Sequence, residues 1–271
     1  MPNLHAARVQ NALADSVVGS RIYYRQVTGS TMDDARELAH DGEREGVVVI
    51  AEEQNKGRGR FNRQWVSPPG LGLTLSIVLR PPLERLRLLN MAACVALVDA
   101  IHGRTGLPAT VKWPNDVLLN GKKVAGILIE ARVVAEVSLK AGGYAVLGVG
   151  LNVNHNPSPS LTPPAEATSI ADTLGRPVER TPLLQAFLRA LDVQWVQGPD
   201  DEALFQRWRG MLGTLGRRVS VAWGGASSPT QTSTEGVAVD VTRDGDLVLR
   251  RDDGSIMTLN AGEVTVLGAS A

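Results

Sequence analysis

Three arginines lie in one short, glycine-containing segment, GRGRFNR, which begins at Gly57. The guanidinium groups of Arg58, Arg60 and Arg63 stay charged and donate paired hydrogen bonds, which suits phosphate and carboxylate oxygens. Gly57 and Gly59 allow the backbone to come close to a ligand. The segment therefore indicates a site for a small polyanion, such as a nucleoside triphosphate or an acyl phosphate. A solvated basic loop that binds RNA weakly explains the arginines alone equally well.

A second polar group lies in VKWPNDVLLNGKKVAGILIEA. Asn115 and Asp116 offer the oxygen ligands that Mg²⁺ prefers. Lys123 enters an apolar stretch, which is costly unless its charge meets a negative partner. Taken alone, however, Asn115-Asp116 is a turn pair, and Lys123 is an ordinary hairpin charge.

Composition excludes several other classes of function. The chain has 271 residues, with 28 basic and 28 acidic side chains, and this balance argues against a broad nucleic-acid-binding surface. No P-loop, no GxGxxG after a strand and no GxSxG elbow occurs in the sequence. The single cysteine, Cys94, lies in an apolar helical run and is predicted to be a buried structural thiol. The four histidines lack metal-ligand spacing: His5, His40, His102 and His155.

The elements that must position these residues are mixed. Strands are predicted at residues 46–54 and 71–79, on either side of the arginine segment, and helices at residues 33–40 and 85–102. The dipeptide Asn120-Gly121 predicts a hairpin between residues 117–119 and 122–130. A second hairpin is predicted between residues 133–141 and 144–153, and two helices follow, one after Pro182 and one at residues 200–211.

The tail changes character near Gly216, where five short apolar segments alternate with turn residues. This spacing predicts a small β-barrel of about 55 residues. The chain is therefore predicted to have an α+β fold, with a mixed sheet flanked by helices in residues 1–214 and the barrel in residues 215–271. We find no secretory signal and no membrane-spanning run, and we expect a cytoplasmic protein without a membrane partner.

In this order and spacing, GRGRFNRQWVSPPG, LTLSIVLRP, KWPNDV, KVAGILIE and GVGLNVN resemble the biotin protein ligases. These enzymes attach biotin to the carrier domain of acetyl-CoA carboxylase and related enzymes. The resemblance runs from about residue 22 to the end, and it implies a class II synthetase-like catalytic domain with a small Src-homology-3-like barrel. Because only some 20 residues precede this core, the resemblance is to the type without an N-terminal DNA-binding domain.

The resemblance also implies roles for individual residues. Arg60 and Lys123 are expected to be catalytic, and Asp116 to bind the metal. The ATP-binding residues are expected to be Arg63, Trp65, Asn115 and Asn152. The biotin-binding residues are expected to be Ser30, Thr31, Gln54, Gly57, Arg58, Gly59, Arg60, Lys123 and Gly126. Two positions depart from the family's usual pattern around the Ser-Thr pair, because Gly29 precedes it and Met32 follows it.

The implied reaction uses ATP and Mg²⁺ to convert biotin into biotinyl-5′-AMP, from which a carrier lysine takes the biotin. A lipoate or octanoate ligase or transferase is the nearest alternative, and a non-catalytic RNA-binding module is a distant one. A homodimer formed by pairing of strands such as Val124–Ile129 and a monomer are both compatible with the sequence.

Overall fold

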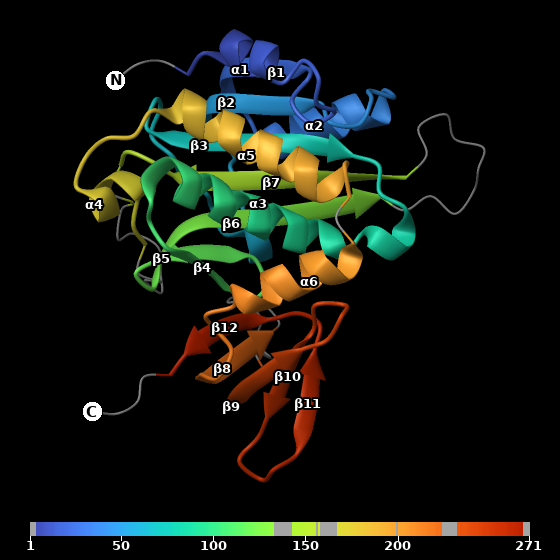
Figure 1. Cartoon of the computed structure of the whole chain (residues 1–271), viewed down its shortest axis with the longest axis vertical. Coiled ribbons are helices and arrows are strands. Elements are labelled where there is room, and N and C mark those ends of the chain that lie inside the picture. Colours follow the sequence, from blue (N-terminus) through green and yellow to red (C-terminus); the bar gives the residue numbers. More distant parts are fainter. Residues whose placement is uncertain are drawn as a thin grey trace.

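The structure, a computed structural model, describes residues 4–132, 143–155, 157, 167–198, 200–223 and 232–267. Two β-sheets dominate it, a seven-stranded sheet and a five-stranded sheet formed by the C-terminal part (Figure 1). Within the described residues, no helix is long and apolar enough to cross a membrane.

The seven-stranded sheet has the order β1-β2-β3-β7-β6-β5-β4. Strands β1 and β2 are parallel, and all the other neighbours are antiparallel, which confirms the predicted mixed sheet. The strands are β1 (Ile22–Thr28), β2 (Val48–Gln54), β3 (Gly72–Leu79), β4 (Ala109–Lys112), β5 (Asp116–Leu119), β6 (Lys122–Arg132) and β7 (Tyr144–Asn152).

One predicted hairpin is confirmed and the other is wrong. Strands β5 and β6 pair across Asn120 and Gly121, which both have positive φ, as an Asn-Gly hairpin turn requires. Strand β7 was expected to pair with residues 133–141, but its hydrogen-bonded neighbours are β6 and β3. Residues 133–141 themselves lie outside the described part of the chain. Pairing with β6 and β3 brings β7 into the middle of the sheet, where all of its residues are buried.

Helices cover the two faces of this sheet unequally. Helix α2 (Thr31–His40) lies on one face, where Met32 and Ala35 pack against Val78 and Val146. Helices α3 (Leu88–Thr105) and α5 (Arg180–Trp195) cover the other face (Figure 1). The remaining helical segments are α1 (Ala6–Ala12), α4 (Ile170–Leu174), α6 (Asp201–Gly210) and two short turns, Arg60–Asn62 and Leu83–Arg85.

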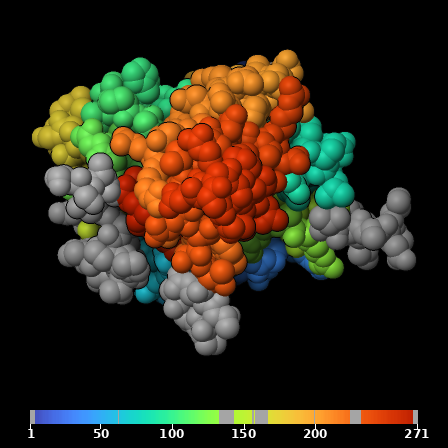
Figure 2. Space-filling view, turned by 90° about the horizontal axis from the view of Figure 1, so that it is seen from below, coloured from blue at the N-terminus to red at the C-terminus, as the bar shows by residue number. Residues whose placement is uncertain are grey.

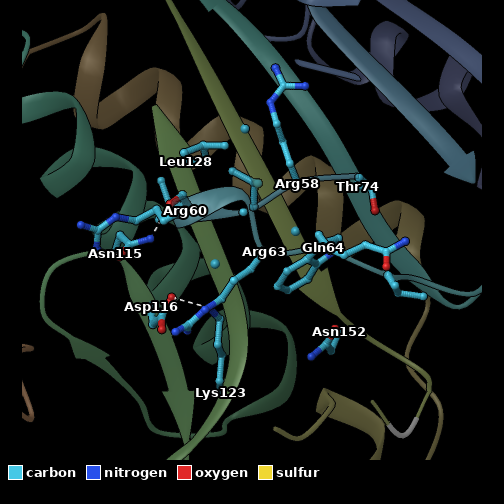
Figure 3. A pocket seen from close by; sticks show the side chains of 18 of the residues that line it. Arg58, Arg60, Arg63, Gln64, Thr74, Asn115, Asp116, Lys123, Leu128 and Asn152 are labelled. Atoms are coloured by element: carbon cyan, nitrogen blue, oxygen red, sulfur yellow. Dashed lines mark hydrogen bonds and ion pairs between the residues drawn. The ribbon is translucent and has the colours of Figure 1, made fainter. Parts of the chain in front are cut away.

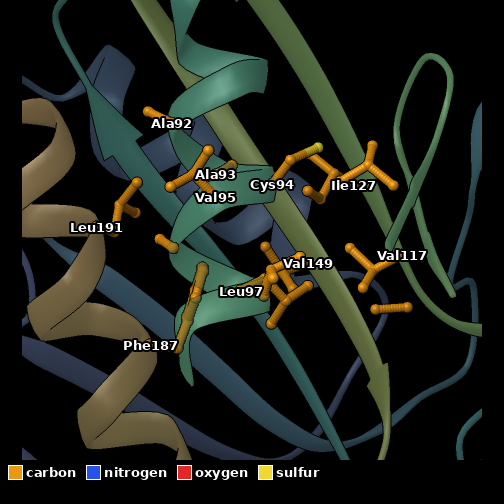
Figure 4. Packing of buried hydrophobic residues seen from close by; sticks show 14 of the residues in the cluster. Ala92, Ala93, Cys94, Val95, Leu97, Val117, Ile127, Val149, Phe187 and Leu191 are labelled. Carbon is orange, nitrogen blue, oxygen red and sulfur yellow. The ribbon is translucent and has the colours of Figure 1, made fainter. Parts of the chain in front are cut away.

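Helix α3 forms the centre of the main core, where its small residues allow close packing between the sheet and α5 (Figure 4). Cys94 is fully buried there, and burial raises the pKa of its thiol to about 12. A thiol held neutral in this way is a poor nucleophile, which agrees with the structural role predicted for it.

Side chains alternate between the two faces of the sheet along β3 and β7, and the face that carries α2 receives the polar residues and glycines. Leu73, Leu75 and Ile77 point into the helix-covered core, whereas Thr74 and Ser76 point to the opposite face. On β7, Gly148, Gly150 and Asn152 likewise fall on the face opposite to the core. Glycines in a buried strand leave room for another group to lie against the backbone. The same face that carries α2 therefore also contains an open, polar floor.

The second sheet consists of the five strands predicted from the tail, in the antiparallel order β11-β10-β9-β8-β12. Its closure into a barrel stays a prediction. Seen from below, the orange and red residues of this sheet occupy the centre of the molecule's face (Figure 2). The strands are β8 (Arg218–Trp223), β9 (Thr232–Val241), β10 (Leu247–Arg250), β11 (Ile256–Leu259) and β12 (Glu263–Val266).

Trp113 joins the two sheets. Its side chain is 1% exposed, and its indole Nε1 donates to the carbonyl of Gly245 at 2.8 Å. Its backbone N–H donates to Thr214 Oγ1 at 3.0 Å. The residue before the Pro-Asn-Asp segment is thereby fixed between the sheets, so Asn115 and Asp116 extend from a rigid support.

A buried ion pair joins β2 to α5. Arg180 donates to the two carboxylate oxygens of Glu52 at 2.7 and 3.1 Å, and both side chains are about 95% buried. Tyr24 Oη also donates to Glu52, at 2.9 Å, as does the backbone N–H of Gly70, at 2.9 Å. Burial acts to raise the pKa of Glu52, but the hydrogen bonds and charge of Arg180 outweigh it and lower that pKa. Through its hydrogen bond with Gly70, Glu52 also fixes the end of the segment that connects the arginines to β3.

We expect Tyr24→Phe to lower the free energy of unfolding by about 1–2 kcal/mol at pH 7, because a buried carboxylate loses one donor. Urea unfolding at pH 7 measures this loss. Tyr23→Phe, on the same strand, is the matched control, because its hydroxyl makes only a 3.4 Å contact with Glu43. This control is expected to cost less than about 0.5 kcal/mol. Equal losses of unfolding free energy in the two variants would show that the hydrogen bond from Tyr24 to Glu52 does not stabilise the fold.

The same hydroxyl makes a pH-dependent contribution. Burial first, and then the hydrogen bond and charge of Glu52, raise the pKa of Tyr24 from 10.0 to about 12. A group whose pKa is raised by folding stabilises the fold below its unfolded pKa and loses that contribution as the pH rises through its folded pKa. The stability difference between wild type and Tyr24→Phe should therefore shrink between pH 10 and pH 12.

Candidate active site

A cavity of about 500 Å³ lies on the α2 face of the seven-stranded sheet (Figure 3). Its floor is formed by β3, β6 and β7, and the arginine segment and β12 contribute to its walls. All of the predicted site residues except Gly57 line it. Gly57 lies behind this wall, where an added Cβ would be 2.4 Å from the carbonyl oxygen of Trp65.

One end of the cavity is polar and uncharged. Gln54 Oε1 accepts hydrogen bonds from the backbone N–H and the hydroxyl of Thr31, at 2.8 and 3.1 Å. The Thr31 hydroxyl also lies 2.8 Å from Ser76 Oγ. Met32 closes this end from above Gly148, where an added Cβ would be 2.5 Å from the methionine sulfur. This end suits a neutral ligand group with several hydrogen-bonding atoms beside an apolar surface.

Ser30 stands at the N-cap of α2 but does not cap it with its side chain. The hydroxyl instead accepts a long 3.4 Å hydrogen bond from Arg58. The first turn of α2 therefore leaves this hydroxyl at the cavity wall rather than using it to satisfy the helix end.

The three arginines point in different directions from the segment, which folds back on itself as a small hairpin (Figure 3). Arg58 is held by two carboxylates, donating to Asp33 at 2.9 and 3.0 Å and to Glu130 at 3.1 Å. Arg36 contacts the same two carboxylates, which closes a network of four charges. The hydrogen bond to Asp33 raises the pKa of Arg58 and lowers that of Asp33. The charge of Arg58 is thus already balanced by the chain.

Arg63 is also paired, but with the second sheet. Its guanidinium donates to both carboxylate oxygens of Glu263, the first residue of β12. Both side chains are about one third exposed, so the pair contributes little to stability and can open at low cost. The C-terminal sheet therefore supplies part of the wall of this site.

Arg60 differs from both. Its described hydrogen-bonding partners are neutral oxygens, Asn115 Oδ1 at 2.9 Å and the carbonyl of Gly262 at 3.2 Å, and its guanidinium lies 5.0 Å from the centre of the Phe61 ring. Among the described residues it forms no ion pair. Burial lowers the pKa of Arg60, while Asp116 and Glu263 act in the opposite direction. A half-buried guanidinium without a carboxylate contact can bind an anionic group of a ligand.

Lys123 faces the same space from the start of β6. Its ammonium lies 2.7 Å from Asp116 Oδ1 and 5.8 Å from the centre of the Trp65 ring. Lys112 also lines the cavity, and burial lowers its pKa whereas Asp116 raises it. Cationic side chains thus outnumber carboxylates in the middle of the cavity, so this part of the cavity attracts phosphate.

Within the described residues, no group of three His, Cys, Asp or Glu side chains could hold a metal by itself. Mg²⁺ commonly uses only one or two protein carboxylates and completes its shell with phosphate and water. The Asp116 side chain is 20% exposed, so a hydrated ion can reach it. The residues therefore fit an ion that arrives with a nucleotide.

Trp65 lies against the glycine floor. An added Cβ at Gly150 would be 2.2 Å from the indole ring, and one at Gly126 would be 3.2 Å from Lys123 Nζ and 3.5 Å from the indole ring. Gly126 and Gly150 are paired across β6 and β7. A side chain at Gly150 would overlap the indole ring of Trp65, whereas one at Gly126 would require the end of Lys123 to shift slightly.

The sequence did not reveal several residues of the site. Asp33, Glu130 and Glu263 hold the arginines, although nothing in their local sequence marks them as partners of residues about 25 to 200 positions away. Ser76 does carry a signal in the sequence, because it is a polar residue in the apolar run LTLSIVL. Three further lining residues had no predicted role: Lys112, Gln64 and His155.

Comparisons with known proteins agree with this geometry. The model of the Biotin/lipoate A/B protein ligase family matches residues 24–152, and that of the biotin protein ligase C-terminal domain matches residues 214–267. A biotin--[acetyl-CoA-carboxylase] ligase of Mycobacterium tuberculosis is 33% identical over 273 residues, which cover 95% of each chain.

Two other similarities differ in coverage. The bifunctional ligase/repressor BirA of Bacillus subtilis is 34% identical over 195 residues, and the match covers 71% of this chain and 59% of that protein. The structure of a biotin protein ligase from Aquifex aeolicus in complex with biotin and ATP has a TM-score of 0.72 and 25% identity. That similarity covers 91% of this chain and 98% of the Aquifex chain.

Proposed function

The chain belongs to the biotin protein ligase family, and on that premise we propose that it is a biotin–[acetyl-CoA-carboxylase] ligase. It joins biotin to AMP at the expense of ATP, and then passes the biotin to a lysine of the biotin carrier domain of acetyl-CoA carboxylase. The cytoplasm is the expected location. The observation that carries this proposal is Arg60, a half-buried guanidinium whose hydrogen-bonding partners are neutral and which lies in one cavity with Lys123.

The first half-reaction brings two anions together. A carboxylate oxygen of biotin attacks the α-phosphorus of ATP, the bond to the β-phosphate oxygen breaks, and pyrophosphate leaves. Arg60 and Lys123 lower the repulsion between the carboxylate and the phosphate and stabilise the charge that builds up on the α-phosphate. When bound at Asp116, Mg²⁺ neutralises further phosphate charge.

The polar end of the cavity orients the acid. The ureido ring of biotin has two N–H donors and a carbonyl acceptor, and the hydroxyls and amide of Ser30, Thr31 and Gln54 complement such a group. Gly126 leaves room above the sheet for Lys123 and Trp65, two of the residues that line the cavity. The ion pairs of Arg58 with Asp33 and Glu130 fix the first part of the arginine segment. Because these carboxylates already balance its charge, Arg58 positions the segment and does not offer a free charge to the ligand.

In the second half-reaction, the uncharged amine of the carrier lysine attacks the acyl carbon. The bond from that carbon to the phosphate oxygen breaks, AMP leaves, and the amine loses a proton to become an amide. Water would cleave the same mixed anhydride, so the arginine segment must cover the intermediate until the carrier arrives. Arg63, Trp65, Asn115 and Asn152 bind the nucleotide part.

We propose residues 1–214 as the biotin- and ATP-binding unit and residues 215–271 as the C-terminal unit. Glu263 and Gly262 then contribute from the second unit to the wall of the first. A homodimer remains an alternative to a monomer. Ala125 and Gly126 are paired with both β5 and β7, so any pairing of β6 across a two-fold axis is limited to residues beyond them.

The direct test mixes the protein with ATP, Mg²⁺, labelled biotin and an unmodified biotin carrier domain. We expect label on the carrier in an ATP-dependent reaction, and none when the acceptor lysine of the carrier is replaced by arginine. Labelled lipoate and octanoate are run in parallel. Transfer of these acids in place of biotin would reassign the chain to the lipoate branch, and ATP-independent binding of RNA with no transfer would reject a ligase altogether.

A further inference from the structure

Phe61, at the tip of the arginine segment, has an unusual backbone conformation. Its φ is 56° and its ψ is 32°, which lie in the left-handed region. Among the described residues other than glycine, only Asn120 shares a positive φ. Asn120 belongs to an Asn-Gly hairpin turn, where such a value is usual, whereas a bulky phenylalanine in this region is an outlier. Outliers of this kind concentrate at functional sites, so the conformation of Phe61 points to a role in the site.

Backbone hydrogen bonds around Phe61 show what this conformation achieves. The N–H of Arg63 donates to the carbonyl of Arg60 at 3.2 Å, and the N–H of Gly59 donates to the carbonyl of Arg63 at 2.7 Å. Phe61 is therefore the first central residue of the tight turn that closes the small hairpin. A positive φ at this position is normally supplied by Gly, Asn or Asp. The turn fixes where Arg60 leaves the backbone at the cavity wall.

The ring of Phe61 is not held by the protein core. It is 41% exposed, and in the part of the chain that the structure describes it belongs to neither buried apolar cluster. It lines the cavity, and the guanidinium carbon of Arg60 lies 5.0 Å from the ring centre. A cation within about 6 Å of an aromatic ring is attracted to its face. Core packing therefore does not compensate the backbone strain, whereas the contact with Arg60 gives the ring a function.

The Arg60 guanidinium is restrained on one side only. Its Nη1 donates to both Asn115 Oδ1 and the carbonyl of Gly262. Its Nη2 and Nε form no hydrogen bond among the described residues, and neither atom is enclosed. One nitrogen is thus fixed to the wall, and the ring restrains the guanidinium plane. Two donors in the fork geometry that suits a phosphate or carboxylate stay accessible to a ligand.

We propose that Phe61 is the positioning residue for Arg60. This inference rests on the proposed function, which supplies the adenylate that Arg60 binds. The left-handed turn sets the origin of the Arg60 side chain, and the ring restrains its guanidinium before the ligand arrives. A side chain that is already ordered loses less conformational freedom on binding, so the complex is tighter. Phe61 acts through Arg60 and not through contact with the reacting atoms.

The first test follows the dissociation of biotinyl-5′-AMP from Phe61→Leu. Leucine keeps an apolar side chain but removes the aromatic face. We expect dissociation to become about two- to fivefold faster, as for the loss of an exposed cation–π contact. Phe61→Tyr keeps the ring and should retain the adenylate as well as wild type does.

Tyr23→Leu is the matched control. It removes a ring that lies 5.3 Å from the Arg21 guanidinium, on β1 and outside the described lining of the cavity. Dissociation of the adenylate should be unchanged in this variant.

A double variant tests whether the effect passes through Arg60. If Phe61 only positions Arg60, Phe61→Leu should cause no further acceleration in a chain that already carries Arg60→Ala. The same acceleration in both backgrounds would show that the ring acts independently of the guanidinium, which would overturn the proposal.

Phe61→Asn separates positioning from support of the fold, and it also serves if Phe61→Leu does not fold. Asparagine adopts the left-handed conformation more readily than phenylalanine. We therefore expect thermal unfolding at or above the wild-type temperature, together with faster dissociation. A lower unfolding temperature with unchanged retention would make Phe61 a structural residue only.

Wild-type retention in every Phe61 variant would refute this inference while leaving the ligase intact. Failure of the wild-type protein to form biotinyl-5′-AMP at all would instead reject the proposed function. The two failures are therefore distinguishable.

Discussion

We expect Lys123→Ala to lower the rate of biotin-dependent ATP–pyrophosphate exchange by about 10²–10³-fold, which corresponds to about 2.7–4 kcal/mol of transition-state stabilisation. The ammonium lies in the middle of the cavity, between Asp116 and the Trp65 ring. It is therefore placed to meet the carboxylate and the α-phosphate at the moment when their charges are closest.

The physical reason is the position of this charge rather than its mere presence. Lys123 stands on a strand that is paired on both sides, and the Asp116 carboxylate holds its ammonium at 2.7 Å. A charge fixed before the reaction stabilises the transition state without the cost of reorganisation. The methyl group of alanine offers nothing in its place.

Lys122→Ala is the matched control, because Lys122 is the exposed neighbour on the same hairpin and does not line the cavity. We expect near wild-type exchange from it. Thermal unfolding of both variants checks that the loss in Lys123→Ala does not come from the unpaired Asp116. If Lys123→Ala retained the exchange rate of the control, Lys123 would be only a partner of Asp116.

The second large effect concerns retention of the intermediate. We expect Arg60→Gly to accelerate the dissociation of biotinyl-5′-AMP by about 30–150-fold, equivalent to the loss of a charge-assisted contact of about 2–3 kcal/mol. Dissociation is followed after dilution of the preformed complex into excess unlabelled biotin and ATP.

The reason lies in the partners of the three arginines. Arg58 is neutralised by Asp33 and Glu130, and Arg63 by Glu263. Among the described residues Arg60 contacts two neutral oxygens and the ring of Phe61 but no carboxylate, so its charge is available to the adenylate at the lowest cost. Carboxylates of the chain thus neutralise Arg58 and Arg63. The charge of Arg60 stays available to the ligand.

Arg60→Gly also adds backbone freedom to the segment, so Arg60→Ala is measured beside it. Equal acceleration in the two variants attributes the effect to the lost guanidinium. An effect in Arg60→Gly alone would attribute it to backbone flexibility, and an unchanged off-rate in both would remove Arg60 from the proposed site.

Much of the fold was predictable because it is encoded locally. Asn120-Gly121 specifies a tight turn without reference to the rest of the chain, and the apolar run before Leu79 specifies a buried strand. The partner of β7 was not predictable in this way. Its choice of β6 and β3 depends on burying both faces of the strand, which only the complete sheet determines.

The candidate site shows the same division. Residue types that suit phosphate and biotin lie in recognisable segments, so Arg60 and Lys123 could be named from the sequence. Their counter-charges could not, because Glu263 reaches Arg63 from another sheet and Glu130 reaches Arg58 across the cavity wall. These long-range pairs also explain why a cluster of arginines does not repel itself before a ligand binds.

The central claim is that the cavity forms biotinyl-5′-AMP and holds it until an amine takes the acyl group. It is tested most directly by incubating the protein with biotin, Mg²⁺ and ATP labelled in the adenine or in the γ-phosphate, without carrier, and separating the protein from free ligands. We predict that biotin and adenine label elute with the protein in equal amounts, that γ-phosphate label does not, and that added carrier domain releases AMP as it gains biotin. Retention of biotin without adenine label, or of γ-phosphate together with adenine, would contradict the account.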